Sequence, residues 1–320
     1  MAYAYNHHNH PTCMKTIYIL FALLFSFSLY TFAQQQNDTP YEVKQFTLPS
    51  GSEVTVETVG GNIEVKGGQT GQAKVEMYVR NPQWKRKLSN EDIKERLANY
   101  LVDISQSGNK LAIKVTPKSK NMDWEDEGLS ISFKLFVPAQ VQTKLQATGG
   151  NISLADVTGR QSVKTTGGNI SLDEIKGDAD VDCTGGNIGV KQYNGKIAVS
   201  CSGGNINIGD ASGEFQVQTA GGNLHFDNVS GSVKGQTAGG NISANIKELG
   251  KYLTLTTSGG NIHADFPTNK GLDYDIKADR INARVENFKG SHETDRIQGS
   301  TNGGGIPVKI STSGGNIRMN

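Results

Sequence analysis

The sequence has no excess of charge of either sign. Its 32 Lys and Arg residues are balanced by 31 Asp and Glu residues, which leaves a formal net charge of +1 at pH 7. A protein that binds nucleic acid or other polyanions in general needs a basic excess to neutralise phosphates. The charge balance argues against that class of protein.

Helix-forming segments are also scarce, whereas glycine is abundant, with 39 residues. A glycine content well above the average predicts many turns and many short strands. The length of 320 residues is enough to bury a substantial core, in one long domain or in two ordinary ones.

Cysteine is limited to three residues, and none follows the apolar run Ile17–Phe32 at its end, so a lipid-anchored lipoprotein is disfavoured. Lys15 before this run and Thr31-Phe32-Ala33 at its end complete the three-part plan of a secretory signal peptide. The run is shorter than the roughly 20 residues that a membrane-spanning helix needs. A cleaved signal is therefore expected rather than a transmembrane anchor.

Residues 1–33 are accordingly expected to be a leader and signal peptide, cleaved near Ala33, and residues 34–41 a linker. The leader contains His7, His8 and His10, but a segment outside the fold favours no metal role for them. No second apolar span exists. The sequence predicts an extracytoplasmic protein, in the periplasm, on the outer surface or secreted, with no stable membrane insertion after cleavage.

The tripeptide GGN recurs at a fixed interval along the chain. Between Gly149 and Gly239 the copies are equally spaced. The copies begin at Gly60, Gly149, Gly167, Gly185, Gly203, Gly221, Gly239, Gly259 and Gly314. A fixed period of this kind indicates a repeat architecture.

Apolar residues keep the same register in each repeat and alternate with polar ones, as in Asn169-Ile170-Ser171-Leu172. Alternation predicts strands with one buried face, and stacked repeats bury that face together. The glycines then lie at corners, where a positive φ is expected of them, and asparagines at one corner can hydrogen-bond in a ladder. The inward columns are Ile152, Ile170, Ile188, Ile206, Leu224 and Ile242; Leu154, Leu172, Val190, Ile208, Phe226 and Ala244; and Val163, Val181, Val199 and Val217.

The sequence thus predicts an all-β, single-stranded parallel β-solenoid with about 18 residues per coil. A left-handed hexapeptide helix is excluded, because steps of six residues from Ile152 lead to Thr158 and Lys164. A right-handed β-helix is preferred, since right-handed crossovers dominate parallel sheets.

The regular repeats are expected over 141–267, with less regular coils over 268–320. Residues 42–140 are interpreted as an irregular, strand-rich N-terminal part that caps the solenoid edge. This part carries one short helix candidate, Ser89–Leu101, with Ser89 as its N-cap. Further strands are predicted over 53–58, 74–79, 102–105, 111–115 and 129–137, and 124–127 is expected to be an exposed loop.

The order of these motifs resembles a known family. A GGNIEV opening, a strand-rich insert, the step Val137-Pro138, an array of TxGGNIxL coils and a closing GGGIPVKISTSGGNIRMN are similar to the bacterial "putative adhesin" β-solenoid family, related to auto-transporter adhesin heads. The resemblance covers residues 42–320. It implies surface adhesion, and it brings no catalytic or binding residue with it.

A carbohydrate-active enzyme of the β-helix type needs clustered carboxylates with a basic partner on neighbouring coils. Four aspartates lie near one bend of successive coils: Asp156, Asp173, Asp210 and Asp227. Asp173 is shifted by one position, and the coil of Gly185 has Gln192 and Tyr193 instead. The pattern favours a structural role at the turn.

Other sites are also disfavoured. Calcium solenoids carry an aspartate in every GGxGxDxUx turn, which GGNI lacks. The backbone N–H groups of each GGN could hold an anion, but stacked coils are expected to use them for one another. His225 and His263 lie two coils apart, about 10 Å, too far to share a metal. We expect no catalytic residue, cofactor-binding residue, cofactor or metal ligand.

Cys183 and Cys201 occupy the same inward position of consecutive coils, where other coils have threonine. Their Cα atoms are expected about 4.8 Å apart, within the range of a disulfide, but the parallel direction of the side chains strains that bond. Two free, buried thiols are preferred over a disulfide.

The outward positions carry small polar side chains, such as Ser153, Ser171, Asn207 and Ser243. We therefore expect a non-catalytic secreted or envelope module, adhesive or structural, whose partner is a glycan or protein at the cell surface. One alternative is an envelope sensor or scaffold that binds another protein. A second is a carbohydrate-active β-helix enzyme.

Overall fold

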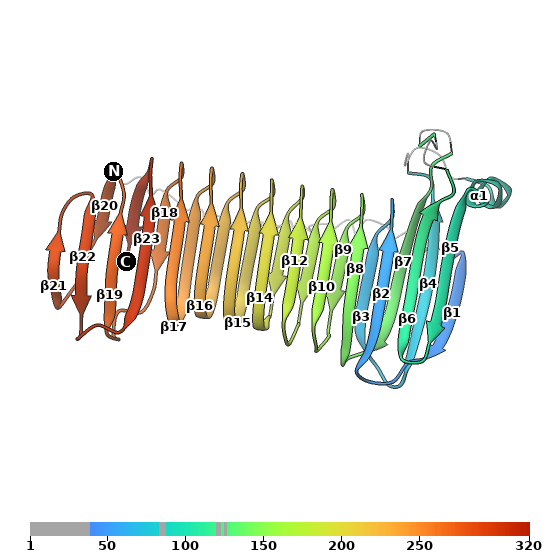
Figure 1. The fold of residues 1–320 in the computed structure, drawn as a ribbon, viewed down its shortest axis with the longest axis horizontal. Helices are drawn as coiled ribbons and strands as arrows, with labels where there is room; N and C mark the ends of the chain where they lie inside the picture. The colour runs from blue at the N-terminus through green and yellow to red at the C-terminus, as the bar shows by residue number, and fades with distance from the viewer. Residues whose placement is uncertain (1–38, 83–87, 120–122, 125–126) are drawn as a thin grey trace, which may run out of the picture. The chain divides into compact units, whose positions relative to one another are not determined.

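The structure, a computed structural model, describes residues 39–82, 88–119, 123–124 and 127–320. The predicted signal peptide and the three leader histidines lie outside these residues, as does the middle of the loop expected over 124–127. The described chain is all-β with a single helix, and its strands form one continuous solenoid-like sheet. Figure 1 shows the strands of residues 39–320 stacked side by side.

Two rows of strands make up the stack. Row A runs β8 (Val141–Ala147), β10 (Gln161–Thr165), β12 (Ala179–Cys183), β14 (Asn194–Cys201) and the second halves of β15 (Ile206–Thr219), β16 (Leu224–Thr237) and β17 (Ile242–Thr257). Row B runs β9 (Ile152–Ala155), β11 (Ile170–Asp173), β13 (Ile188–Lys191), the first halves of β15, β16 and β17, and β18 (Ile262–Asp265).

Neighbouring strands in both rows are parallel and in register with the repeat. Val163 pairs with Val181 in row A, and Ile170 pairs with Ile188 in row B, so each step advances 18 residues along the chain. Register shifts between β16 and β17 absorb two additional residues, and Thr237 then pairs with Thr257.

The core lies between the two rows and consists of the predicted inward columns. Ile152, Leu172 and Val181 are each 1% exposed. Phe215 and Phe226, for which inward positions are predicted, are 0% and 1% exposed. The alternation in the sequence therefore identifies the buried face correctly.

The backbone angle φ at the glycine corners differs from the expected positive value. Among the GGN glycines only Gly186 has a positive φ, of 112°, so the predicted reason is wrong for the other copies. At Gly204 the requirement is steric, because a Cβ atom there would lie 1.6 Å from the carbonyl oxygen of Gly186 in the preceding coil. Glycine is needed because backbones of successive coils nearly touch at this corner.

At the N-terminal end the order of strands in space departs from their order in the chain. β2 (Ser52–Thr58) pairs with β8 on one side and with β6 (Lys110–Pro117) on the other. β3 (Ile63–Gln69) likewise lies between β9 and β7 (Ser130–Pro138). Antiparallel strands follow outside: β5 (Tyr100–Ser107) on β6, β4 (Gln72–Arg80) on β7, and β1 (Glu42–Thr47) on β4.

The C-terminal end has a similar insertion. β23 (Ile306–Thr312) lies between β17 and β19 (Leu272–Lys277), and β24 (Asn316–Met319) lies between β18 and β20 (Arg280–Ala283). Two antiparallel strands complete row A, β22 (Arg296–Thr301) on β19 and β21 (Phe288–His292) on β22. The last coil of the sequence is thus an inner coil of the stack.

The helix α1 spans Asn90–Leu97, which is shorter than the predicted Ser89–Leu101. Ser89 is the N-cap, as predicted, and exchanges capping hydrogen bonds with Asp92. The prediction is wrong after residue 97, because Tyr100 already belongs to β5. Its side chain is 4% exposed, and its hydroxyl accepts a hydrogen bond from the Leu129 backbone N–H. This tertiary contact overrides local helix propensity.

Candidate functional site

The GGN corners use their polar groups within the stack. The Asn169 N–H donates to Asn151 Oδ1 at 2.8 Å, and Asn187 repeats this bond with Asn169. The ladder continues through each copy from Asn62 to Asn316. The predicted asparagine ladder is therefore present, as bonds from backbone N–H groups to side-chain oxygens.

The glycine N–H groups of this corner are also occupied. Gly167 N–H donates to the Thr148 carbonyl at 3.1 Å, and Gly168 N–H donates to Thr165 Oγ1 at 3.2 Å. An anion at this corner would need the same N–H groups, so the corner offers no backbone nest to a ligand.

The inner column beside the corner joins successive coils. Thr237 Oγ1 donates to the Gly222 carbonyl at 2.8 Å and accepts from Gly240 N–H at 3.2 Å. Thr165 and Thr257 make the same pair of bonds in their coils. The threonine hydroxyls of this column therefore hydrogen-bond each coil to the preceding one, and the side chains are buried.

Cys183 and Cys201 occupy this column as direct partners on β12 and β14, and both are free thiols. Cys183 Sγ approaches the Gly185 carbonyl at 3.2 Å. Burial, together with the neighbouring Cys201 thiol, raises the pKa of Cys183 to about 12. A thiol that stays protonated is a poor nucleophile and a poor metal ligand.

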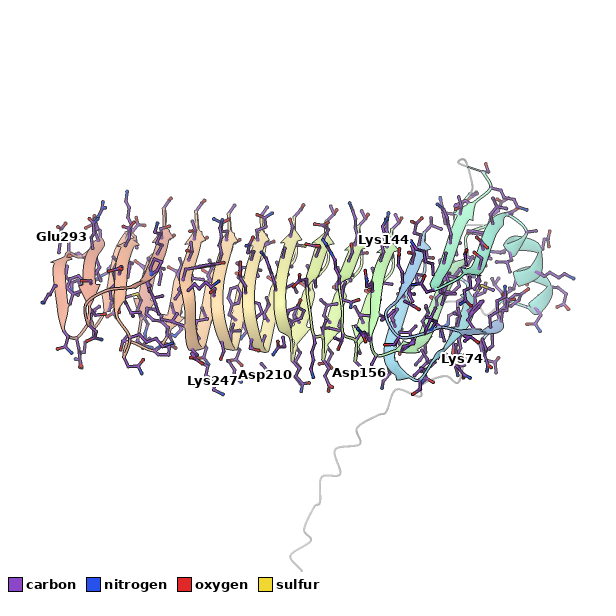
Figure 2. The ribbon with its side chains drawn as sticks, turned by 60° about the horizontal axis from the view of Figure 1, so that its bottom comes forward. Lys74, Lys144, Asp156, Asp210, Lys247 and Glu293 are labelled. Atoms are coloured by element: carbon purple, nitrogen blue, oxygen red, sulfur yellow. The ribbon has the colours of Figure 1, made fainter. Side chains whose placement is uncertain are left out.

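A second bend follows row B, and its residues are left-handed in successive coils. The residues with positive φ are Asp156, Glu174, Gln192, Asp210 and Asn228, with φ between 51° and 60°. Asp and Asn, which occupy three of these five positions, tolerate this conformation better than most residues. Figure 2 shows Asp156 and Asp210 projecting along the same edge of the stack.

The four predicted aspartates therefore divide into two sets. Asp156 and Asp210 belong to the left-handed bend, whereas Asp173 and Asp227 precede it by one residue. Asp210 Oδ1 accepts a hydrogen bond from Asn228 Nδ2 at 2.7 Å, and Asp227 Oδ1 accepts one from Asn245 Nδ2 at 3.0 Å. Both of these carboxylates are partnered by an amide of the next coil.

Tyr193, which follows Gln192 at this bend, is buried at 1% exposure. Its hydroxyl donates to the Gly177 carbonyl at 2.6 Å, and burial raises its pKa. It is a core residue that packs edge-on against Phe215.

The two histidines lie on the outer face of row B with Ser243 between them, as the spacing predicts. His263 Nε2 is 3.2 Å from Asp265 Oδ2 on its own strand. Among the described residues no three His, Cys, Asp or Glu side chains are grouped closely enough for a metal ion.

Hollows lie on the outer faces of the described strands, and we consider two of them. One, of about 370 Å³, lies over β12, β14, β15 and β16 and is lined by polar residues such as Asp180, Ser200 and Gln216. The larger, of about 840 Å³, lies over the outer face of β17, β18, β24 and β20 at the C-terminal end of row B. We call this larger hollow the row B groove.

Sequence reasoning missed the left-handed column and the row B groove. The column had a signal, since Asp, Glu, Gln or Asn recurs once in every coil from Asp156 to Asn228. The groove had none, because it depends on the insertion of β24 between strands that precede it in the chain.

These features define an all-β repeat solenoid with two polar outer faces. A family model described as Toastrack DUF4097 matches residues 36–320, and the chain belongs to this family. No curated protein matches the chain. In the described residues, no helix has the length and apolar character needed to cross a membrane.

Several solved structures are similar at low identity. A "putative lipid binding protein" from Parabacteroides distasonis ATCC 8503 is 13% identical over 89% of this chain and 98% of its own, with a TM-score of 0.41. A "putative adhesin" from Bacteroides fragilis NCTC 9343 is 13% identical over 87% of this chain and 96% of its own, with a TM-score of 0.34. A "putative adhesin" from Parabacteroides merdae ATCC 43184 is 10% identical over 89% and 97%, with a TM-score of 0.31. At these identities and TM-scores, the descriptions carry no role and no ligand across to this chain.

Proposed function

We propose that this protein is a non-catalytic extracytoplasmic module, adhesive or structural, that binds a surface partner over the outer faces of its coils. One observation carries the proposal. The corner N–H groups, the asparagine Oδ1 atoms and the Asp210 carboxylate at the bend are hydrogen-bonded within the stack, so what remains for a partner is the regular rows of outward side chains and the asparagine amino groups.

The mechanism follows from this geometry. Ser153 and Ser171 are direct neighbours on β9 and β11, and strands in a sheet lie about 4.8 Å apart. A surface of this kind is rigid before binding, so a long ligand meets many weak contacts at little entropic cost to the protein. Extended recognition without a deep pocket suits adhesion to a polymer or to a protein.

The winding of the coils is part of the proposal. Parallel pairing with one constant step per coil supports a β-helix, and the strong preference for right-handed crossovers supports a right-handed one. The apolar segment Ile17–Phe32 supports export through a cleaved signal peptide. N-terminal sequencing of the exported protein is expected to begin at Gln34.

The test is a binding and turnover screen with the exported protein. We expect retention on an array of glycans or on intact cells, without release of new reducing ends from any polysaccharide. Release of reducing ends that is abolished by Asp156→Asn or Asp210→Asn would refute the non-catalytic proposal. Absence of any glycan or cell binding would refute the adhesive one.

A further inference from the structure

The row B groove concentrates positive charge in a chain whose net charge is only +1. Arg318 on β24 and Arg280 on β20 line it, together with His263 on β18. His263 is the direct neighbour of Arg318, and Arg280 pairs with Asn316, which lies two positions before Arg318 on the same strand. The two arginines are therefore diagonal neighbours on adjacent parallel strands, about 8 Å apart at the backbone.

These guanidinium groups are available to a ligand. Within the described part of the chain, the side chain of Arg280 forms no ion pair or hydrogen bond. Arg318 has only a long contact, from its Nε to Asn320 Oδ1 at 3.5 Å. The acid on the strand of His263, Asp265, is directed to that histidine. A guanidinium group carries five donors and no acceptor, so both arginines select acceptor oxygens.

The asparagine ladder adds donors to the same floor. Asn241 Oδ1 accepts from Asn261 N–H at 2.8 Å, and Asn261 Oδ1 accepts from Asn316 N–H at 2.9 Å. With the oxygens turned toward the next coil, the Nδ2 amino groups of Asn241 and Asn261 remain for solvent or a ligand. The floor of the groove therefore offers cations and neutral donors, which together match an anionic, oxygen-rich molecule.

We propose that the row B groove binds an anionic glycan, with Arg280 and Arg318 holding carboxylate or sulfate groups and the asparagine amides holding hydroxyl oxygens. This inference rests on the proposed function and names its ligand class. The groove spans four strands, which suits a linear polymer that crosses several coils. It has no aromatic lining residue on which a nucleobase could stack, which disfavours single-stranded nucleic acid.

The decisive variant is the double substitution Arg280→Gln/Arg318→Gln, which removes two charges and leaves the buried strand positions unchanged. Its matched control is Lys144→Gln/Lys164→Gln. These two lysines are exposed, lie on β8 and β10, and are also diagonal neighbours on adjacent strands, but on row A. Both variants change the net charge by the same amount.

The full exported chain is tested against polygalacturonate, dextran sulfate and neutral dextran, with circular dichroism of each variant to establish folding. We expect binding to at least one polyanion but not to neutral dextran, and weaker binding as salt rises. The arginine variant should lose about tenfold or more in affinity, because charge-assisted hydrogen bonds are lost, while the lysine control stays within about twofold. The two polymers distinguish carboxylate from sulfate recognition.

Equal losses in both variants, or equal binding to neutral dextran, would overturn the proposal. Binding to anionic vesicles that is lost in the arginine variant, without polyanion binding, would replace the glycan by a membrane and also overturn it. If the protein still binds other array glycans or cells, only this inference fails. Depolymerisation of polygalacturonate would instead overturn the proposed non-catalytic function.

Discussion

The middle of the stack and its two ends both contain parallel coils, but they differ in how the order of the coils in space follows their order in the chain. Between Val141 and Asp265 each coil lies against the coil next to it in the chain, 18 or 20 residues away. At the ends, β2 and β3 pair with strands about 90 residues distant, and β23 and β24 about 55 residues distant. In the middle, the repeated sequence is enough to specify which coil pairs with which. At the ends, each strand pairs with a distant segment that the repeat does not specify.

The largest effect is expected where one inner coil supports the C-terminal end. Ile310 on β23 is fully buried and lies between Leu255 of β17 and Ile276 of β19. Ile310→Ala should lower the free energy of unfolding by about 2–5 kcal/mol, because it leaves a cavity. Lys309→Ala, on the exposed side of the same strand, should stay within about 0.5 kcal/mol.

Hydrogen exchange then compares the end with the middle. Among the described strands, β19 pairs only with β22 and β23, so its amides should lose protection in the Ile310 variant before those of β12 and β14. A uniform loss along the whole stack would show that the end and the middle unfold as one unit.

A corner glycine of the regular coils should give the next largest effect. Gly186→Val is expected to cost more than about 2 kcal/mol, because φ is 112° and a Cβ would lie 2.3 Å from the Gly168 carbonyl oxygen. Gly189, in the same coil, has no atom within 4 Å of its Cβ position. Gly189→Ser should change the free energy of unfolding by less than about 0.5 kcal/mol. Similar midpoints for the two variants in urea would contradict the corner assignment.

The threonine column tests how coils are fastened to one another. Thr237→Val keeps the shape of the side chain but removes the bonds to Gly222 and Gly240, which should cost about 1–3 kcal/mol. Thr254→Val, on the outward side of β17, is the control and should stay within about 0.5 kcal/mol. Equal urea midpoints would mean that these hydroxyl bonds do not stabilise the stack.

Replacing a cysteine of this column by threonine should stabilise the protein, because it adds the hydroxyl hydrogen bonds that the other coils have. Thr165 Oγ1 donates to the Gly150 carbonyl and accepts from Gly168 N–H. In Cys201→Thr, the new hydroxyl should lie within hydrogen-bond distance of the equivalent groups, the Gly186 carbonyl and Gly204 N–H. We expect a gain of about 0.5–1.5 kcal/mol in the free energy of unfolding. A loss measured by thermal unfolding would show that the positive φ of Gly186 prevents this arrangement.

The smallest expected effect concerns alkylation of the two cysteines, which should differ between the native and the unfolded protein. Both thiols are buried and the pKa of Cys183 is raised, so iodoacetamide at pH 8 should leave the native protein without residues 1–33 unmodified. After unfolding without reductant, mass spectrometry should find two alkylated cysteines. A mass two units below the reduced form, with no alkylation, would reveal a disulfide instead.

The sequence predicts the middle of the molecule well, because each coil repeats the same alternation and the same corner. Val163, Ile170 and Leu172 could be assigned to the core from their columns alone. The reason for the glycines could not, since Gly204 has no positive φ and is required by the approach of another backbone. Contact between coils is a tertiary property that local turn chemistry does not contain.

The ends and the groove were beyond prediction for a related reason. The motif GGNIRMN reads as one more coil, and its place between β18 and β20 depends on which edges are free when the chain folds. Arg280 and Arg318 are far apart in the numbering, yet they lie on adjacent strands. Nothing in the composition or the repeat brings these two residues together.

The inserted coil also sets an order of assembly. β19 and β22 leave the ribosome before β23, yet they reach the stack only through β23. Likewise, β2 must find β8 across about 90 residues of later chain. The stack therefore cannot be completed by adding coils in the order of synthesis, and both ends must wait for a late segment that closes them. Such long-range closure slows folding and leaves strand edges unpaired in the meantime, which makes the nascent ends the part of this protein most dependent on protection from aggregation.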